Sequence, residues 1–204
     1  MQPNILLQRA PAAVKVDGVL VPVNSGWRTG IRAMQAIDDP HLGPHDVARA
    51  IVALYYGRWE DGRFSIPEGA RNTAAAVESA LRFFTLCEPR RPTGAPGSRQ
   101  AVRARLWDWD FDAPRAIADF QREYGIDLVD PTLEMHWWRF WSLFRGLSDT
   151  SKTMQAIGIR GARPSRHMSE NERKQLLERQ RELALPARTE AEALKLTNMI
   201  WEIA

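Results

Sequence analysis

The sequence has a single cysteine, Cys87, among its 204 residues. A lone thiol cannot close an intrachain disulfide, and metal sites built from several cysteines are excluded. No apolar run is long enough to cross a bilayer, and the first residues lack the basic segment and apolar core of a secretory signal. We therefore expect a cytoplasmic protein without a membrane partner.

Motifs for nucleotide or metal chemistry are also missing. Gly57, Gly62 and Gly69 lie near one another without the lysine of a phosphate-binding loop. The four histidines are scattered, and a Gly-Pro step between His41 and His45 disfavours a continuous helix that would pair them on one face. No cofactor is predicted, and we expect a protein that is not an enzyme.

The most enzyme-like feature is the acidic trio Asp108, Asp110 and Asp112. Acidic and apolar residues alternate there with period two, so a strand would place all three carboxylates on one face, where a hard cation could bind. The stretch lacks the turn glycine and the distal bidentate acid of a calcium loop. The alternative is an exposed strand face followed by a helix that Asp112 caps.

Basic charge is local. The formal net charge is only +3, and arginines gather between Glu88 and Leu106. Prolines and glycines interrupt this stretch, which indicates a solvated linker and not the sustained basic stripe of a nucleic-acid-binding surface. No nucleic-acid partner is expected. The predicted segments are 1–88 with a β-hairpin and helices, the Pro/Gly/Arg-rich linker 89–98, an aromatic-rich helical domain 99–161, and charged or amphipathic C-terminal helices 162–204.

The N-terminal segment combines a hairpin with helices. The two-residue turn Asp17-Gly18 joins a strand over 13–16 to a strand over 19–23. Helical spacing of apolar residues predicts a helix capped by Ser25 that ends near residue 38, a second over 45–56 and a third over about 67–87. The predicted fold class is mainly α, with an N-terminal β-hairpin followed by a multi-helix bundle and amphipathic C-terminal helices.

Large aromatic side chains concentrate in a helix predicted over 131–147. A single stripe at i, i+3, i+4 and i+7 is formed by Trp137, Phe140, Trp141 and Phe144, with Trp138 to one side. We interpret the stripe as core, with an exposed docking face as the alternative. His136 is interpreted as a partly buried, hydrogen-bonded histidine and not as a catalyst.

The helix before the aromatic one is predicted to end at Tyr124. Gly125 follows as a left-handed C-terminal stop, from which Ile126 folds back onto the helix. Phe120 and Tyr124 share one face of this helix with Ile117, and we expect the aromatic helix to dock on that face.

Two capping boxes, Ser169 with Glu172 and Thr189 with Glu192, predict two C-terminal helices. Their apolar faces are thin, so self-association or partner binding is weighed equally with packing on the main body. The candidate partner-binding residues are Leu176, Leu183, Leu196, Ile200, Trp201 and Ile203.

An ordered series of motifs spans residues 10–186. The motifs are Val16-Asp17-Gly18, Pro22-Val23-Asn24, Trp27-Arg28-Thr29, Tyr55-Tyr56-Gly57, Phe83-Phe84, Asp110-x-Asp112, Tyr124-Gly125-Ile126-Asp127-Leu128, His136-Trp137-Trp138-Arg139-Phe140, Leu143-Phe144-Arg145-Gly146-Leu147, and Ile157-Gly158 with Arg160. In this series the chain resembles the bacteriophage "gene product fifteen" family of tail-assembly proteins.

This resemblance implies a phage or prophage protein encoded beside the tape-measure gene of a long-tailed phage. The implied function is a non-enzymatic tail-assembly chaperone that holds the tape-measure protein until tail-tube protein polymerises around it. The tape-measure protein is then the expected partner, and the tail-tube protein is a further candidate. We expect a homo-oligomer in the host cytoplasm that is absent from the mature virion. The alternatives are a structural minor tail or connector component of the virion, and a metal-dependent enzyme that uses the acidic trio.

Overall fold

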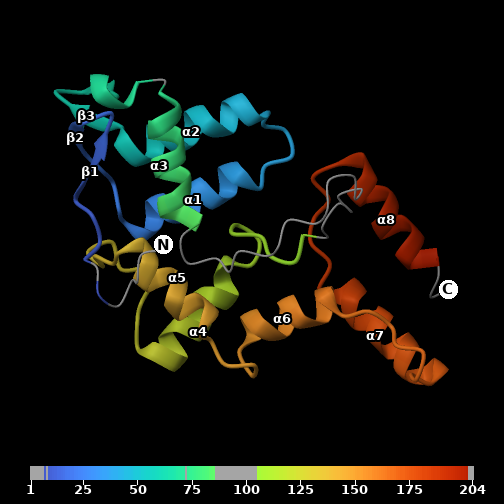
Figure 1. The fold of residues 1–204 in the computed structure, drawn as a ribbon. Helices are drawn as coiled ribbons and strands as arrows, with labels where there is room; N and C mark the ends of the chain where they lie inside the picture. The colour runs from blue at the N-terminus through green and yellow to red at the C-terminus, as the bar shows by residue number, and fades with distance from the viewer. Residues whose placement is uncertain (1–6, 8, 72, 86–104, 202–204) are drawn as a thin grey trace. The chain divides into compact units, whose positions relative to one another are not determined.

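The computed structural model describes residues 7, 9–71, 73–85 and 105–201 (Figure 1). The described residues confirm the mainly α fold class and the N-terminal hairpin. The strands are β1 (Ala13–Val16), β2 (Val19–Pro22), β3 (Arg58–Glu60) and β4 (Arg63–Ser65). The helices are α1 (Trp27–Ile37), α2 (Pro44–Tyr56), the 3-10 helix η1 (Glu68–Ala70), α3 (Ala74–Thr85), α4 (Ala113–Tyr124), α5 (Trp137–Arg145), α6 (Lys152–Gly161), α7 (Glu170–Glu182) and α8 (Glu190–Trp201). Within these residues, no helix has the length and apolar character needed to cross a membrane.

The chain divides into two compact units. Unit 1 comprises Met1–Pro92 and Thr132–Arg145, and unit 2 comprises Thr93–Pro131 and Gly146–Ala204. The aromatic helix α5 belongs to unit 1 because it packs on α1. Its predicted docking on α4, which belongs to unit 2, stays a prediction. The predicted linker 89–98 and Cys87 lie outside the described residues.

Each strand pair in unit 1 is a two-stranded antiparallel hairpin with a two-residue turn. Val16 lies opposite Val19 across Asp17-Gly18, as predicted, and Asp17 and Gly18 have φ of 47° and 86°. The sequence interpretation missed β3 and β4, which are joined by the same dipeptide at Asp61-Gly62. Positive φ at both turn positions suits the twist of a hairpin, and Gly adopts it without a steric penalty.

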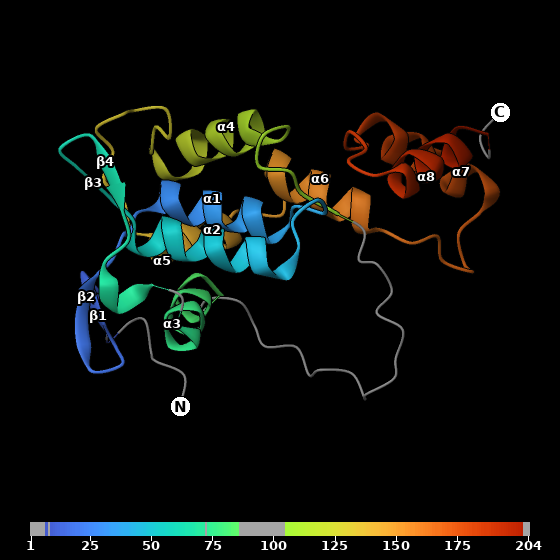
Figure 2. The same cartoon turned by 90° about the horizontal axis from the view of Figure 1, so that it is seen from above.

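The helices of unit 1 pack as α1 on α2 and α5, and α2 on α3 (Figure 2). α1 begins after Gly26 and not at the predicted cap Ser25, and no side chain caps it. The amide of Trp27 instead donates to the Met135 carbonyl at 3.0 Å, and the amide of Trp137 donates to the Ser25 carbonyl at 2.9 Å. The two helix starts thus satisfy each other's first free amide.

This reciprocal pairing, which we call the N-terminal bridge, also shortens the aromatic helix. Residues 26 and 136 form an isolated antiparallel β-bridge, so the backbone before Trp137 is extended and not helical. α5 therefore covers 137–145, where 131–147 was predicted. The third predicted helix is also shorter at its start, because η1 precedes α3.

Unit 2 is built on α4 and α6, which pack on one another. The predicted left-handed stop of α4 is confirmed: Gly125 has φ 65°, and the amide of Ile126 donates to the Phe120 carbonyl at 3.3 Å. The capping box at the start of α7 is confirmed in both arms. At α8 one arm is present, since Thr189 accepts from the Glu192 amide, but the Glu192 carboxylate accepts from the amide of Arg188.

Candidate functional site

The aromatic stripe of α5 lies in the interior of unit 1. Trp137 and Phe140 are fully buried, and Trp141 and Phe144 are nearly so. The Phe140 ring stacks on Trp27 of α1 at 5.1 Å between ring centroids. Such ring pairs add stabilisation beyond the apolar area that they bury. In unit 1 the stripe therefore acts as core.

Two indole groups tie α5 to the end of α3. Trp137 Nε1 donates to the Phe84 carbonyl, and Trp138 Nε1 donates to the Phe83 carbonyl, both at 3.0 Å. Carbonyls in the last turn of a helix have no partner within the helix. The Trp-Trp pair donates hydrogen bonds to two of the final carbonyls of α3. The Phe-Phe and His-Trp-Trp motifs are therefore joined by hydrogen bonds.

A second pair of motifs meets at the end of α2. The side-chain amide of Asn24 donates to the carbonyls of Leu54 at 3.0 Å and Gly57 at 2.7 Å. Arg28 lies 4.4 Å from the centroid of the Trp27 ring and donates to the Leu133 carbonyl at 3.1 Å. In unit 1 the motifs thus serve mutual packing through backbone carbonyls and ring faces.

His136 is partly buried beside the rings of Phe83 and Trp138. Its Nδ1 accepts a hydrogen bond from the Trp138 amide at 3.2 Å, which requires a neutral ring with the proton on Nε2. Burial lowers the pKa of His136 from 6.5 to about 4. The imidazole therefore stays neutral at physiological pH and orients the start of α5.

The acidic trio does not lie on a strand, so that prediction is wrong. Residues 109–112 form a turn, in which Asp108 Oδ1 accepts from the amides of Asp110 and Phe111, both at 2.9 Å. Asp108 and Asp112 are buried, whereas Asp110 is exposed. Asp112 precedes α4 without capping it by a side-chain hydrogen bond. Local hydrogen bonds to aspartate thus replace the extended backbone that the alternating pattern suggested.

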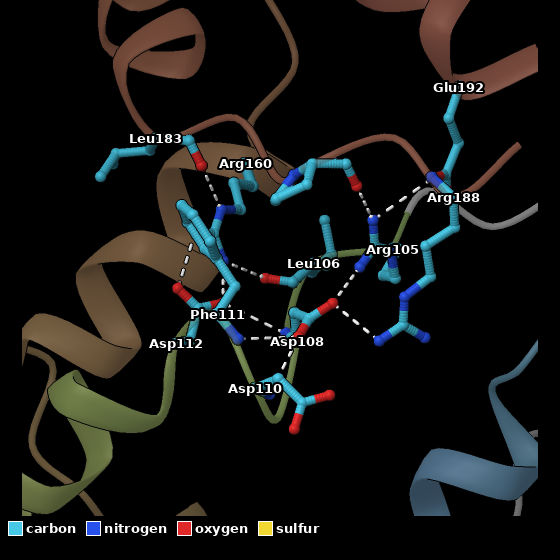
Figure 3. Close-up of polar contacts among 11 residues, drawn as sticks. Arg105, Leu106, Asp108, Asp110, Phe111, Asp112, Arg160, Leu183, Arg188 and Glu192 are labelled. Atoms are coloured by element: carbon cyan, nitrogen blue, oxygen red, sulfur yellow. Dashed lines mark hydrogen bonds and ion pairs between the residues drawn. The ribbon is translucent and has the colours of Figure 1, made fainter.

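Arginine side chains bind the two buried carboxylates of Asp108 and Asp112 (Figure 3). Arg160 of α6 donates to both oxygens of Asp112, at 2.6 and 2.9 Å, in a bidentate pair that is almost fully buried. Arg105 and Arg188 both bind Asp108 Oδ2, the latter at 2.8 Å. We call Arg105, Arg160 and Arg188 with Asp108 and Asp112 the arginine clasp.

Arg160 is the centre of the arginine clasp. Its Nε donates to the Leu183 carbonyl at 2.7 Å, and its Nη1 also donates to the Leu106 carbonyl at 3.0 Å (Figure 3). One side chain thus joins the turn before α4, the end of α7 and its own helix. In the sequence Arg160 appeared only as a motif residue, because its partner Asp112 lies 48 positions away.

Charge and burial act in opposite directions on Asp108. Burial raises the pKa of this carboxyl, but the amide hydrogen bonds from Phe111 and Asp110 and the guanidinium charges of Arg188 and Arg105 outweigh it. The pKa of Asp108 consequently lies below its usual value, and the carboxylate is ionised at neutral pH.

A third buried acid, Asp119, holds the start of α6. Its two carboxylate oxygens accept from the amides of Lys152 and Thr153, at 3.2 and 2.7 Å. Ser151 adds a side-chain cap by accepting from the Met154 amide. Free amides and the helix dipole favour negative charge at this position. Asp119 of α4 and Asp112 just before α4 therefore hold the two ends of α6 through their carboxylates.

The predicted partner-binding residues lie in α7, in α8 and after each of them. Leu176 and Leu183 are half-buried. The side chains of Leu196, Ile200 and Trp201 are outside the described set, as is Ile203 altogether. Their role in partner binding stays a prediction.

An exposed aromatic pair on β3 and β4 was missed. Trp59 is 75% exposed and lies directly opposite Phe64, which is 46% exposed, with ring centroids 5.7 Å apart. The Asp61-Gly62 dipeptide between two three-residue runs was the available signal, since it matches the turn recognised at Asp17-Gly18.

The buried acids of unit 2 serve its internal structure. Asp108, Asp112 and Asp119 are committed to arginines and helix amides. Among the residues that the structure describes, no group of three or more His, Cys, Asp or Glu side chains is placed to hold a metal ion.

Comparison with known proteins gives one match. The family model described as Bacteriophage Gp15 protein matches residues 6–185. No curated protein and no solved structure matches the chain. The matched range contains α1 to α7, the aromatic stripe and every member of the arginine clasp except Arg188. Since the match covers most of the 204 residues, the chain belongs to the Bacteriophage Gp15 protein family.

Proposed function

We propose that this protein is a tail-assembly chaperone that binds the tape-measure protein during tail morphogenesis, without catalysis. Its membership of a family of phage structural or assembly proteins carries the proposal. We further propose that it acts in the host cytoplasm as a homo-oligomer and is absent from the mature virion.

The use of the buried polar groups supports a binding role. Asp112 faces Arg160, and Asp119 faces the amides at the start of α6. A catalytic carboxylate needs access to a substrate and a pKa suited to proton transfer. The pKa of Asp108 is instead held low by its amide hydrogen bonds and arginine neighbours.

The hairpins of unit 1 offer the best candidate surface for the client. Four large apolar side chains project from them into solvent: Val19 at 54%, Leu20 at 66%, Trp59 at 75% and Phe64 at 46% exposure. Contiguous exposed apolar groups mark interaction sites, and the rings of Trp59 and Phe64 lie side by side at 5.7 Å between centroids. A long helical client presents apolar stripes, and an exposed apolar surface is the complement that such a stripe requires. We call Trp59 and Phe64 the hairpin patch.

Co-expression with the tape-measure protein encoded by the same phage tests the proposed function. The expected result is a complex of the two proteins and a larger soluble fraction of the client. No complex and no gain in client solubility would contradict the proposal.

Two matched variants test the hairpin patch. Trp59→Ser combined with Phe64→Ser should abolish the gain in client solubility, while circular dichroism shows unchanged helix content. Val129→Ser is the control, because Val129 is 64% exposed but lies in unit 2. If both variants lost the gain in client solubility equally, the hairpin patch would not be the client surface.

Analysis of purified phage particles separates the chaperone from a structural tail component. Mass spectrometry should find the tape-measure and tail-tube proteins but not this chain. Stoichiometric recovery of the chain in particles would favour the minor tail or connector role. Light scattering of the purified protein tests the proposed homo-oligomer.

A further inference from the structure

The C-terminal helices bury few of the apolar side chains that the structure describes. α7 has no buried residue. Among the side chains described from residue 162 onward, Leu185 alone is buried. Helices of 12 or 13 residues are marginal in water on their own, so α7 and α8 depend on their attachments to unit 2.

The described side chains and backbone of this region make several polar attachments to the rest of unit 2, and most of these converge on the arginine clasp. Arg160 binds the Leu183 carbonyl, Arg105 binds the Pro186 carbonyl, and Arg188 binds Asp108 (Figure 3). Gln180 of α7 separately donates to the carbonyls of Ile159 and Ala162 at the end of α6, at 2.9 and 2.8 Å.

The ion pairs of the arginine clasp differ in exposure. The Arg160–Asp112 pair has side chains that are 5% and 0% exposed. In the outer pairs, Arg188 is 26% exposed against Asp108, and Glu192 is 33% exposed against Arg105 at 3.3 Å. Salt screens exposed pairs far more than buried ones. Added salt should therefore weaken the outer pairs and leave the Arg160–Asp112 pair in place.

We propose that residues 183–201 form a strap that the outer ion pairs hold closed and that opens while α4 and α6 remain folded. The opening separates Arg188 from Asp108 and Glu192 from Arg105, and it exposes Leu185. The family match ends at residue 185. Asp108, to which Arg188 of the strap binds, therefore lies inside the matched range, and most of the strap lies beyond it. The strap goes beyond the proposed function and requires no tape-measure protein.

Hydrogen–deuterium exchange of the full chain tests the strap. In roughly 1 M sodium chloride, amides of α8 should exchange about tenfold faster than at low salt, because weakening two exposed pairs corresponds to about one order of magnitude in the opening equilibrium. Amides of α4 and α6 should keep their low-salt rates.

Two variants report on the outer pairs separately. Arg188→Gln should speed exchange of α8 at low salt and reduce its further response to added salt, because only the Arg105–Glu192 pair then remains. Glu192→Gln provides the second test, since it leaves Asp108 and Arg160 untouched. Lys174→Gln is the control: it removes an exposed charge from α7 and should retain the full salt response.

Two outcomes would overturn the strap. The first is exchange of α8 that neither salt nor Arg188→Gln nor Glu192→Gln changes. The second is equal acceleration in α4, α6 and α8, which would mean that unit 2 opens as one cooperative body.

Discussion

Gly30 of α1 lies against the Trp137 ring of α5, and its replacement by alanine should destabilise the protein. A Cβ atom built at this position would lie 2.0 Å from Cε3 and 2.2 Å from Cδ2 of Trp137. The indole cannot move away easily, because it is fully buried and donates a hydrogen bond to the Phe84 carbonyl. The ring would have to shift by more than 1 Å to restore an ordinary carbon–carbon contact of about 3.5 Å.

The size of the effect follows from two opposing contributions. Alanine in place of glycine favours a helix interior by about 1 kcal/mol. Overpacking a rigid core costs about 1–3 kcal/mol and occasionally more, and a contact this short places Gly30→Ala at or above the upper end of that range. We expect a net loss of roughly 2 kcal/mol or more in the free energy of unfolding.

Gly158 offers a matched control in another helix. It is exposed in α6, and a Cβ atom there would meet nothing within 4 Å. Gly158→Ala should therefore stabilise the protein by up to about 1 kcal/mol. Urea unfolding followed by circular dichroism measures both variants. A Gly30→Ala protein as stable as the parent would refute the packing of α1 against α5 described above.

Three further predictions concern unfolding free energy. Arg160→Ala should cost about 2–3 kcal/mol, because it removes the bidentate partner of the buried Asp112, which keeps only Arg115 and the Asp108 amide; a loss below about 1 kcal/mol in urea would contradict this. Gly125→Ala should cost about 1–2 kcal/mol, since alanine is strained at φ 65°, and unchanged urea stability would contradict that strain. His136 binds a proton less readily in the folded state than in the unfolded state. Its contribution to the free energy of unfolding is therefore complete above about pH 6.5 and is lost as the pH falls towards about 4. The ring is partly exposed, so we expect a loss of roughly 1–2 kcal/mol, less than the full shift implies. His136→Asn should flatten the curve of unfolding free energy against pH between about pH 4 and 6.5. An unchanged slope would mean that other groups cause the loss of stability in this range.

Local signals explain which elements of the fold were predictable. The turn at Asp17-Gly18, the stop at Gly125 and the capping box at Ser169 each depend on residues only a few positions apart. Their chemistry is fixed by the backbone nearby, so the sequence indicates them directly.

Long-range partners explain the errors. Alternation of acidic and apolar residues suggested a strand at Asp108–Asp112, but the partner that buries Asp112 is Arg160, 48 positions further on. Ser25 has the side chain of a helix cap, yet its carbonyl accepts from Trp137 and α1 starts one residue later. Periodicity carries no information about such distant donors.

The N-terminal bridge has a consequence for the order of folding during synthesis. It joins residues 25–27 to residues 135–137, and unit 1 includes Thr132–Arg145. On the ribosome the first 92 residues therefore emerge without α5, and the surfaces of Trp27, Phe83 and Phe84 that the aromatic helix covers stay uncovered until residue 145 has left the exit tunnel. A nascent chain that stops before Thr132 would lack the means to close its own core, so unit 1 can only mature after most of the message has been translated.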